Sequence, residues 1–216
     1  MLYYSTISPE LRSALEIVMD ADILKPFRLV GGTSLSLQLG HRISIDIDLF
    51  TEATYGSLNF EHIETYLKSE FPHISFSSDI TSFGKSYFVG KDPENAVKLD
   101  IFYSDPFIED ELLVNKIRLA GLKDISAMKI EVVQNGGRKK DFWDLHELLN
   151  HFSLDQMLEF HKNRYPYNHD YDLIIKNFTN FEIADEDFDV LCLKGKHWEI
   201  IKTDFENLVK NFTDKQ

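Results

Sequence analysis

The chain has 216 residues, of which 43% are hydrophobic, and a formal net charge of −13. This length is enough for one large domain or for a domain with a smaller annex. No run approaches the roughly 18 apolar residues of a membrane span, and the N-terminus lacks a basic or long apolar region, so we expect a cytoplasmic protein without membrane contacts. The single cysteine, Cys192, excludes an intrachain disulfide and a cysteine-based zinc cluster.

Charge is unevenly distributed along the chain. The negative total argues against indiscriminate nucleic-acid binding, which requires an excess of Lys and Arg. Between Asp110 and Lys140, however, there are seven cations and four anions, whereas residues 181–190 carry five acids and no base. We expect the acidic segment to be a solvated surface, and a polyanionic substrate to use one positive face only.

The first half of the chain predicts alternating helices and strands, from apolar periodicity and capping residues. The expected elements are a helix over 9–24 capped by Ser8, a strand over 27–30, a helix over 33–39 ended by Gly40, a strand over 44–51, a helix over 60–71 capped by Asn59, and strands over 74–77, 86–89 and 96–103. The turn sequence GKDPEN predicts a hairpin between the last two strands.

The second half predicts helices only. They are expected over 124–135, ended by Gly136-Gly137, over 138–149, over 153–165 and near 197–212. The fold class is therefore α+β: residues 1–122 form a mixed sheet with flanking helices, and residues 123–216 form a helical region packed on that core.

Three aspartates stand out in strands that are otherwise apolar. Because alternate residues of a strand share a face, Asp46 and Asp48 present their carboxylates together. Asp100, on another strand with the same pattern, joins them if the two strands are neighbours. Buried carboxylates need a compensating cation, and oxygen ligands on a rigid sheet suit Mg²⁺ or Mn²⁺. A polar strand edge is the simpler interpretation of an isolated Asp-x-Asp pair.

A glycine pair precedes the first two aspartates. Gly31 and Gly32 follow a strand and open a helix, where backbone N–H groups can hold a phosphate, and Thr33 and Ser34 add hydroxyl donors. A tight turn requires glycine for steric reasons alone. The combination with a carboxylate pair, however, indicates a site for phosphoryl or nucleotidyl transfer.

Two blocks of the sequence resemble a known family. GGTSLSLQLGHRISIDIDLF contains the glycine and aspartate pairs typical of the polymerase β-type nucleotidyltransferase superfamily. Together with DISAMKIEVVQNGGRKKDFWDLHELL, it resembles the AbiEii/AbiGii toxin family of nucleotidyltransferases over roughly residues 27–150. The resemblance implies the polymerase β-type fold, with a helical C-terminal region that completes the nucleotide site.

The resemblance also implies roles for individual residues. Gly31, Gly32 and Ser34 would hold the nucleotide phosphates, and Asp46 and Asp48 would bind two metal ions. Asp100 would be the third carboxylate, nearest the acceptor, and would take or steer its proton. In the second block the matching positions are Lys129, as the nucleotide-site lysine, and Arg138, Asp141 and Asp144, as the Arg-x-x-Asp-x-x-Asp block.

The second block has an alternative interpretation from the residues themselves. Asp141 and Asp144 share a helix face, and either could form a structural ion pair with Arg138 or Lys129. The stem of Lys129 lies among apolar residues, so its amine is directed at one partner, either a phosphate or one of these carboxylates. Arg42 and Ser44 flank the aspartate strand and could support its geometry, whereas His41 is interpreted as a loop residue.

The function that follows is metal-dependent transfer of a nucleoside monophosphate from a nucleoside triphosphate to a hydroxyl acceptor. The acceptor could be an RNA such as tRNA, or a protein. The resemblance implies a toxin of a bacterial toxin–antitoxin or phage-defence system, with a separately encoded antitoxin as partner. One rival is a non-catalytic nucleotide-sensing module on the same fold. A sugar-nucleotide transferase is the other, but it leaves the glycine pair and the Lys129 block unexplained.

Overall fold

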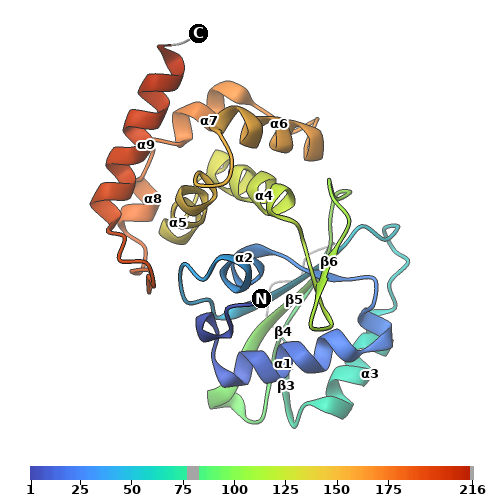
Figure 1. Cartoon of the computed structure of the whole chain (residues 1–216). Coiled ribbons are helices and arrows are strands. Elements are labelled where there is room, and N and C mark those ends of the chain that lie inside the picture. The colour runs from blue at the N-terminus through green and yellow to red at the C-terminus, as the bar shows by residue number, and fades with distance from the viewer. Residues whose placement is uncertain (77–82, 215–216) are drawn as a thin grey trace. The chain divides into compact units, whose positions relative to one another are not determined.

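The structure is a computed structural model, which describes residues 1–76 and 83–214. The chain divides into two compact units (Figure 1). The first comprises Met1–Gly40 and Ser44–Gly121, and the second comprises His41–Ile43 and Leu122–Gln216. The role assigned to residues 123–216, completion of a nucleotide site, stays a prediction.

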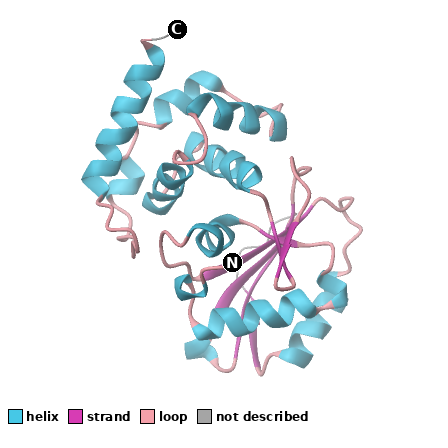
Figure 2. Cartoon of the chain, viewed as in Figure 1, coloured by secondary structure: helices cyan, strands magenta, loops and turns pink. Residues whose placement is uncertain are grey.

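The first unit contains a mixed sheet, drawn in magenta in Figure 2. Its strands are β1 (Arg28–Leu29), β2 (Asp46–Thr51), β3 (His73–Phe76), β4 (Gly84–Gly90), β5 (Val97–Tyr103), β6 (Leu112–Val114) and β7 (Ile117–Leu119). They lie in the order β3-β4-β5-β2-β1-β7-β6. The β2–β5 and β1–β7 pairs are parallel and the other pairs are antiparallel. The predicted α+β class with a mixed sheet is confirmed.

The helices of the first unit have the expected capping residues Ser8, Gly40 and Asn59. They are α1 (Pro9–Asp20), α2 (Gly31–Leu39) and α3 (Phe60–Glu70), with short 3-10 turns at Tyr4–Thr6, Asp22–Leu24 and Pro93–Asn95. Ser8 Oγ accepts a hydrogen bond from Leu11 N at the start of α1, and Gly40 ends α2 with a φ of +66°. The helix expected over 9–24 is interrupted at Ala21, which is extended.

One face of the central strands β2 and β5 packs into the core. Ile47 and Leu49 of β2, and Leu99 and Ile101 of β5, are fully buried in one hydrophobic cluster with residues of α1 and α3. In Figure 1 these two helices lie on the same side of the strands. Since side chains alternate along a strand, the residues between them, including the aspartates, project from the opposite face.

The second unit is helical, as predicted. Its helices are α4 (Leu122–Gln134), α5 (Lys139–Leu148), α6 (Leu154–Arg164), α7 (Tyr171–Asn177), α8 (Glu182–Asp185) and α9 (Trp198–Thr213). Phe142 of α5 anchors an aromatic core, with its ring centroid 5.1 Å from that of Phe181 and 5.5 Å from that of Phe205. Residues 41–43 join this unit through a β-bridge between Arg42 and Cys192. None of the described helices is long and apolar enough to cross a membrane.

Several short elements were not predicted. The β6–β7 hairpin has three-residue strands, and its turn uses Asn115 and Lys116 at positive φ instead of the usual glycine. Helices α7 and α8 are too brief to show a clear apolar period. The strand expected over 74–77 is observed as β3, and its last residue, Ser77, lies outside the described residues.

The acids of the stretch 181–190 are largely exposed, as expected. Two of them also form ion pairs: Asp187 binds Arg138 at 2.7 Å and Asp189 binds Lys139 at 2.9 Å. These ion pairs lie within the second unit. Among the cations of residues 110–140, Lys116 and Lys129 pair with acidic side chains and Arg118 donates to backbone carbonyl groups.

Candidate active site

The three predicted aspartates lie on two adjacent strands. In the parallel ladder of β2 and β5, Asp48 is the direct partner of Asp100, and Asp46 is the partner of Lys98. Neighbouring strands are about 4.8 Å apart, so the side chains of Asp48 and Asp100 leave the sheet side by side. Asp46, two residues before Asp48 on β2, projects from the same face. The sheet therefore brings the carboxylates together on the face that the core does not use.

Gly31 lies directly against this face. A Cβ atom at Gly31 would be 2.4 Å from Asp48 Oδ2, and the residue has a φ of +66°. Both conditions favour glycine, because a side chain would collide with the carboxylate and strain the backbone. The glycine pair thus allows the first turn of α2 to approach Asp48 at a distance that no other residue permits.

The N-terminus of α2 has no side-chain cap. The N-cap residue is Val30, whose side chain makes no capping hydrogen bond, and the first N–H groups of a helix have no partner within the helix. Gly32 is in this first turn as well. An anionic ligand beside Asp48 would therefore meet backbone donors and the positive end of the helix dipole.

The hydroxyl groups of Thr33 and Ser34 are used inside the protein. Thr33 is 1% exposed; its hydroxyl donates to the carbonyl of Asp46, and its Oγ1 lies 2.8 Å from Ser44 Oγ, whose hydroxyl can donate to it. Ser34 is fully buried, and its Oγ accepts from Gln38 Nε2 at 3.1 Å. The Thr33 hydroxyl thus links α2 to Ser44 and to β2, whereas the Ser34 hydroxyl is bonded within α2.

Asp100 has one satisfied oxygen and one unsatisfied oxygen. Lys98 Nζ donates to Asp100 Oδ2 at 2.6 Å, whereas Asp100 Oδ1 is buried without a hydrogen-bond partner. Partial burial acts to lower the pKa of Lys98, yet its pKa is raised, because it bonds to Asp100 and lies near the charges of Asp46 and Asp48. Lys98 was not among the predicted site residues. The sequence feature that could have indicated Lys98 is its position two residues before Asp100, on the same face of β5.

The donor set fits a hard divalent cation. Three carboxylates share one face of paired strands, and one of them has a buried oxygen that no protein group satisfies; such ligands suit Mg²⁺ or Mn²⁺. Among the described residues, no group of three or more His, Cys, Asp or Glu side chains is arranged to hold an ion as it stands. The bond between Lys98 and Asp100 turns one carboxylate oxygen toward the ammonium, so an ion would compete with this lysine.

The second unit holds the other predicted residues in a buried ionic network. Lys129 Nζ donates to Asp141 Oδ1 at 2.6 Å and lies 2.7 Å from Asp144 Oδ2. Arg42 binds the two oxygens of Asp144 at 2.6 and 2.8 Å, and His41 Nε2 is 2.7 Å from Asp144 Oδ1. All five side chains are buried. The ion-pair alternative for Lys129 is therefore realised within this unit.

Charge pairing outweighs burial in this network. Burial alone would raise the pKa of Asp144, but Arg42 and Lys129 hold it well below its usual range. Burial likewise acts to lower the pKa of Lys129, whereas Asp141 and Asp144 keep it raised. Asp144 is thus an anion surrounded by cationic donors, which is a stable arrangement only if all partners are present.

His41 and Arg42 have positions that sequence reasoning did not anticipate. His41 is a loop residue, as interpreted, and its ring is fully buried against Asp144. The guanidinium of Arg42 binds Asp144 and also donates to the carbonyl of Ile43, and its support of the aspartate strand stays a prediction. Arg138, the first residue of the predicted block, is half-exposed and binds Asp187.

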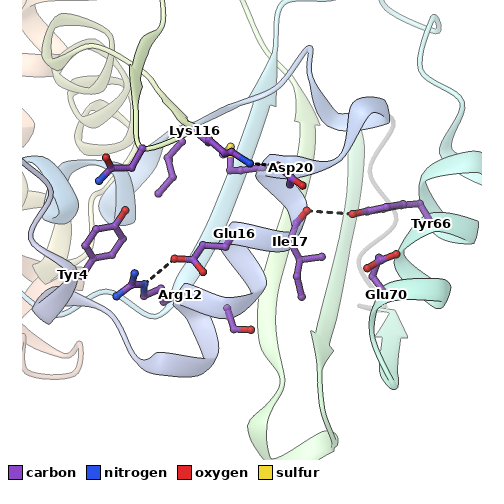
Figure 3. Close-up of a pocket in the computed structure, with 12 residues that line it drawn as sticks. Tyr4, Arg12, Glu16, Ile17, Asp20, Tyr66, Glu70 and Lys116 are labelled. Carbon is purple, nitrogen blue, oxygen red and sulfur yellow. Dashed lines mark hydrogen bonds and ion pairs between the residues drawn. The ribbon is translucent and has the colours of Figure 1, made fainter.

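A pocket of about 590 Å³ lies elsewhere in the first unit (Figure 3). It is lined by α1, α3 and the β6–β7 turn, with Arg12 paired to Glu16 and Lys116 paired to Asp20. None of the predicted site residues lines it. The candidate active site is therefore the carboxylate face beside Gly31.

The mixed sheet and the helical second unit are the fold of known nucleotidyltransferase structures. Solved structures agree on the fold: a candidate nucleotidyltransferase from H. pylori has a TM-score of 0.60 and 21% identity, and covers 95% of this chain and 92% of its own. The nucleotidyltransferase toxin MenT4, Rv2826c, from Mycobacterium tuberculosis H37Rv has a TM-score of 0.51 and 12% identity, and covers 94% of this chain and 86% of its own.

The chain belongs to the AbiEii family, described as nucleotidyl transferase AbiEii toxin of a Type IV toxin–antitoxin system, whose model matches residues 14–214. A relative of nearly equal length is the uncharacterized protein aq_aa25 of Aquifex aeolicus (strain VF5), which is 29% identical over 219 residues, or 96% of this chain and 98% of the relative. The protein is accordingly a nucleotidyltransferase.

Proposed function

We propose that the protein transfers a nucleoside monophosphate from a nucleoside triphosphate to a hydroxyl acceptor, in a reaction that depends on a divalent metal. The observation that carries the proposal is the position of Asp48, which is paired with Asp100 on one side and touches Gly31 on the other. A carboxylate between a second carboxylate and a helix N-terminus can hold a cation and its phosphate ligand at once.

Mg²⁺ or Mn²⁺ would be held by Asp46, Asp48 and Asp100. When bound, a pair of such ions lowers the pKa of an attacking hydroxyl and neutralises the leaving pyrophosphate. The protein supplies position and charge: the carboxylates fix the cation site on a rigid sheet, and the backbone N–H groups of Gly31 and Gly32 hold the phosphates. Asp100, with its free buried oxygen, is our candidate for accepting the acceptor's proton.

The second unit contributes to this proposal through its basic residues. Lys129 would neutralise charge on the triphosphate, and Arg138, Asp141 and Asp144 would support it, as in the family motif. For Lys129 this requires a change of partner, because its ammonium is bound to Asp141 and Asp144 in this structure. Ser34 would likewise have to give up its bond from Gln38 to reach a phosphate.

The family description supplies the biological part of the proposal. A Type IV toxin–antitoxin assignment supports the role of a toxin, with a separately encoded antitoxin as partner and a function in phage defence. We expect it to act in the cytoplasm, where nucleoside triphosphates are abundant. The acceptor that we favour is an RNA such as tRNA, with a protein hydroxyl as the other candidate.

Incubation with each of the four α-labelled nucleoside triphosphates, Mg²⁺ and total cellular RNA tests the proposal. We expect one or more nucleotides to be incorporated into RNA, and Asp46→Ala to abolish incorporation. Asp22→Ala is the matched control, because this exposed aspartate forms only a surface pair with Lys25. Sequencing of RNA 3′ ends identifies the acceptor. Incorporation that survives Asp46→Ala contradicts the catalytic assignment, and nucleotide binding without transfer favours a sensing module.

A further inference from the structure

Two phenylalanine rings continue the carboxylate face of the sheet. Phe50 and Phe102 are direct partners in the β2–β5 ladder, two residues beyond Asp48 and Asp100. Because alternate residues share a face, their rings project from the same side as the carboxylates. Their centroids are 5.9 Å apart and the ring planes are inclined by 48°. The next row of this face is therefore aromatic.

The neighbouring strands accommodate these rings. Gly84 of β4 is the partner of Phe102, and a Cβ atom at Gly84 would lie 2.6 Å from Phe102 Cγ. On the other side, Arg28 of β1 is the partner of Phe50, and its guanidinium lies 3.7 Å from the ring centroid of Phe107. Glycine on one flank thus leaves room for Phe102, and a cation stacked on an aromatic ring borders Phe50.

The two rings do not belong to the hydrophobic core of the first unit. That core occupies the opposite face, where Leu49 and Ile101 are fully buried. Phe50 and Phe102 are only half-buried, although their neighbours along the same face are charged or polar. Partly exposed aromatic rings beside a reactive centre are the usual platform for an unpaired nucleobase, because every base has a face that can stack.

The direction of the reaction decides which base occupies this platform. The segment that follows the glycine pair lies near the N-terminal end of β2, because Thr33 contacts Ser44 and Asp46. The two phenylalanine rings lie toward the C-terminal ends of β2 and β5. In nucleotidyl transfer the attacking and leaving oxygens are roughly in line. If the pyrophosphate departs on the glycine side of Asp48, the acceptor approaches from the side of the rings.

We propose that Phe50 and Phe102 form a stacking subsite for the terminal base of the acceptor, which is therefore an unpaired polynucleotide end. This inference rests on the proposed function, because the carboxylates define the point of attack. It assigns the two rings to the acceptor and leaves the incoming nucleotide to the glycine turn. A protein hydroxyl would have no base to place on them.

Fluorescence anisotropy with a short single-stranded RNA, labelled at its 5′ end, tests the subsite in the presence of Mg²⁺. We expect the double variant Phe50→Leu, Phe102→Leu to bind the RNA at least about tenfold more weakly, as loss of stacking on one base predicts. Phe76→Leu is the matched control, because this ring is 52% exposed on β3 and lies outside the row. Calorimetric titration with a non-hydrolysable nucleoside triphosphate should give the same affinity for all three proteins.

Each other outcome overturns the proposal. Unchanged RNA affinity of the double variant shows that the rings do not stack on the acceptor, and a selective loss of nucleotide affinity assigns them to the incoming base. Absence of RNA binding by the wild type excludes a polynucleotide end. If the double variant does not fold, the same RNA with an abasic 3′ terminus serves instead: equal binding of both RNAs by the wild type contradicts the subsite.

Asp48→Asn separates this proposal from the proposed function. This variant should bind the RNA at least as tightly as the wild type, because it removes a negative charge, but it should not transfer nucleotide. Transfer by Asp48→Asn would contradict the proposed function and leave the binding result intact. Normal transfer to a protein, together with no RNA binding, would contradict the stacking subsite alone.

Discussion

Gly31 is required by two independent features of its position. Its φ of +66° favours glycine, and any Cβ atom would collide with Asp48 Oδ2. We expect Gly31→Ala to displace the Asp48 carboxylate and to reduce nucleotidyl transfer by roughly a hundredfold or more, since misplacing a reacting group by about 1 Å costs that much. Initial rates with a saturating labelled nucleotide measure the effect.

Gly56→Ala is the control for backbone strain. Gly56 has a similar φ of +81°, but no atom lies within 4 Å of the place that a Cβ atom would take there. Both substitutions should lower the free energy of unfolding by about 1 kcal/mol. Only Gly31→Ala should lose activity, and equal activity of the two variants would contradict the assigned role of Gly31.

The sequence predicted individual residues of the site unequally well. Alternation in residues 44–51 placed Asp46 and Asp48 on one face, and the same pattern placed Asp100 opposite the core. The pattern could not show that β2 and β5 are neighbours, because strand pairing over such a separation has no local signal. Phe50 and Phe102 were visible on the acidic faces, but a hydrophobic residue in a strand is usually interpreted as core.

At the scale of elements, α4 and α5 are joined by the ionic network around Asp144. Asp144→Asn would leave the buried charges of Arg42 and Lys129 without their shared anion. We expect it to lower the free energy of unfolding by about 3–5 kcal/mol, measured by denaturant titration followed by circular dichroism. Asp204→Asn, at a half-exposed pair with His146, should cost less than about 1 kcal/mol. Similar effects of the two substitutions would contradict the structural role of the network.

A second coupling between elements involves two histidines. His161 of α6 is buried, with Nε2 2.8 Å from Glu131 Oε2 of α4 and Nδ1 2.8 Å from His169 Nδ1. Burial lowers the pKa of His161 despite its bond to Glu131. The unfolded chain then binds more protons than the folded one below the ordinary pKa of 6.5, so stability should fall as pH decreases through this value.

His161→Gln tests this pH dependence. The free energy of unfolding of the wild type should decrease between about pH 7.5 and 5.5, and the variant should show a shallower decrease over the same interval. His62→Gln, at an exposed position on α3, should keep the slope of the wild type. A slope that is unchanged in His161→Gln would contradict the assignment.

Helices could be predicted from the sequence where an apolar period of helical spacing begins or ends at a capping residue. Ser8 and Asn59 cap the starts of helices and Gly40 caps the end of one, as expected, and the core strands β2 and β5 follow the alternation of the sequence. The β6–β7 hairpin and α7 were missed because they are short. The membership of residues 41–43 in the helical unit was also missed, since it depends on a bridge to Cys192 far along the chain.

At the scale of the whole molecule, the net charge of −13 limits how RNA can be held. Of the cations in residues 110–140, Lys116, Lys129, Arg138 and Lys139 bind acidic side chains and Arg118 binds carbonyl groups. Binding by stacking should therefore release few counterions. We expect the logarithm of RNA affinity to fall with the logarithm of salt with a slope smaller in magnitude than about 2. A markedly steeper slope, measured by anisotropy, would indicate a phosphate-binding face instead.

The central claim is that the carboxylate face transfers a nucleotide and not a phosphate group. The most direct measurement compares a nucleoside triphosphate labelled at the α-phosphate with the same compound labelled at the γ-phosphate, each with Mg²⁺ and total RNA. Only the α label should enter RNA, and EDTA or Asp48→Asn should prevent this. Transfer of the γ label, or α-label transfer that persists with EDTA and in Asp48→Asn, would contradict it.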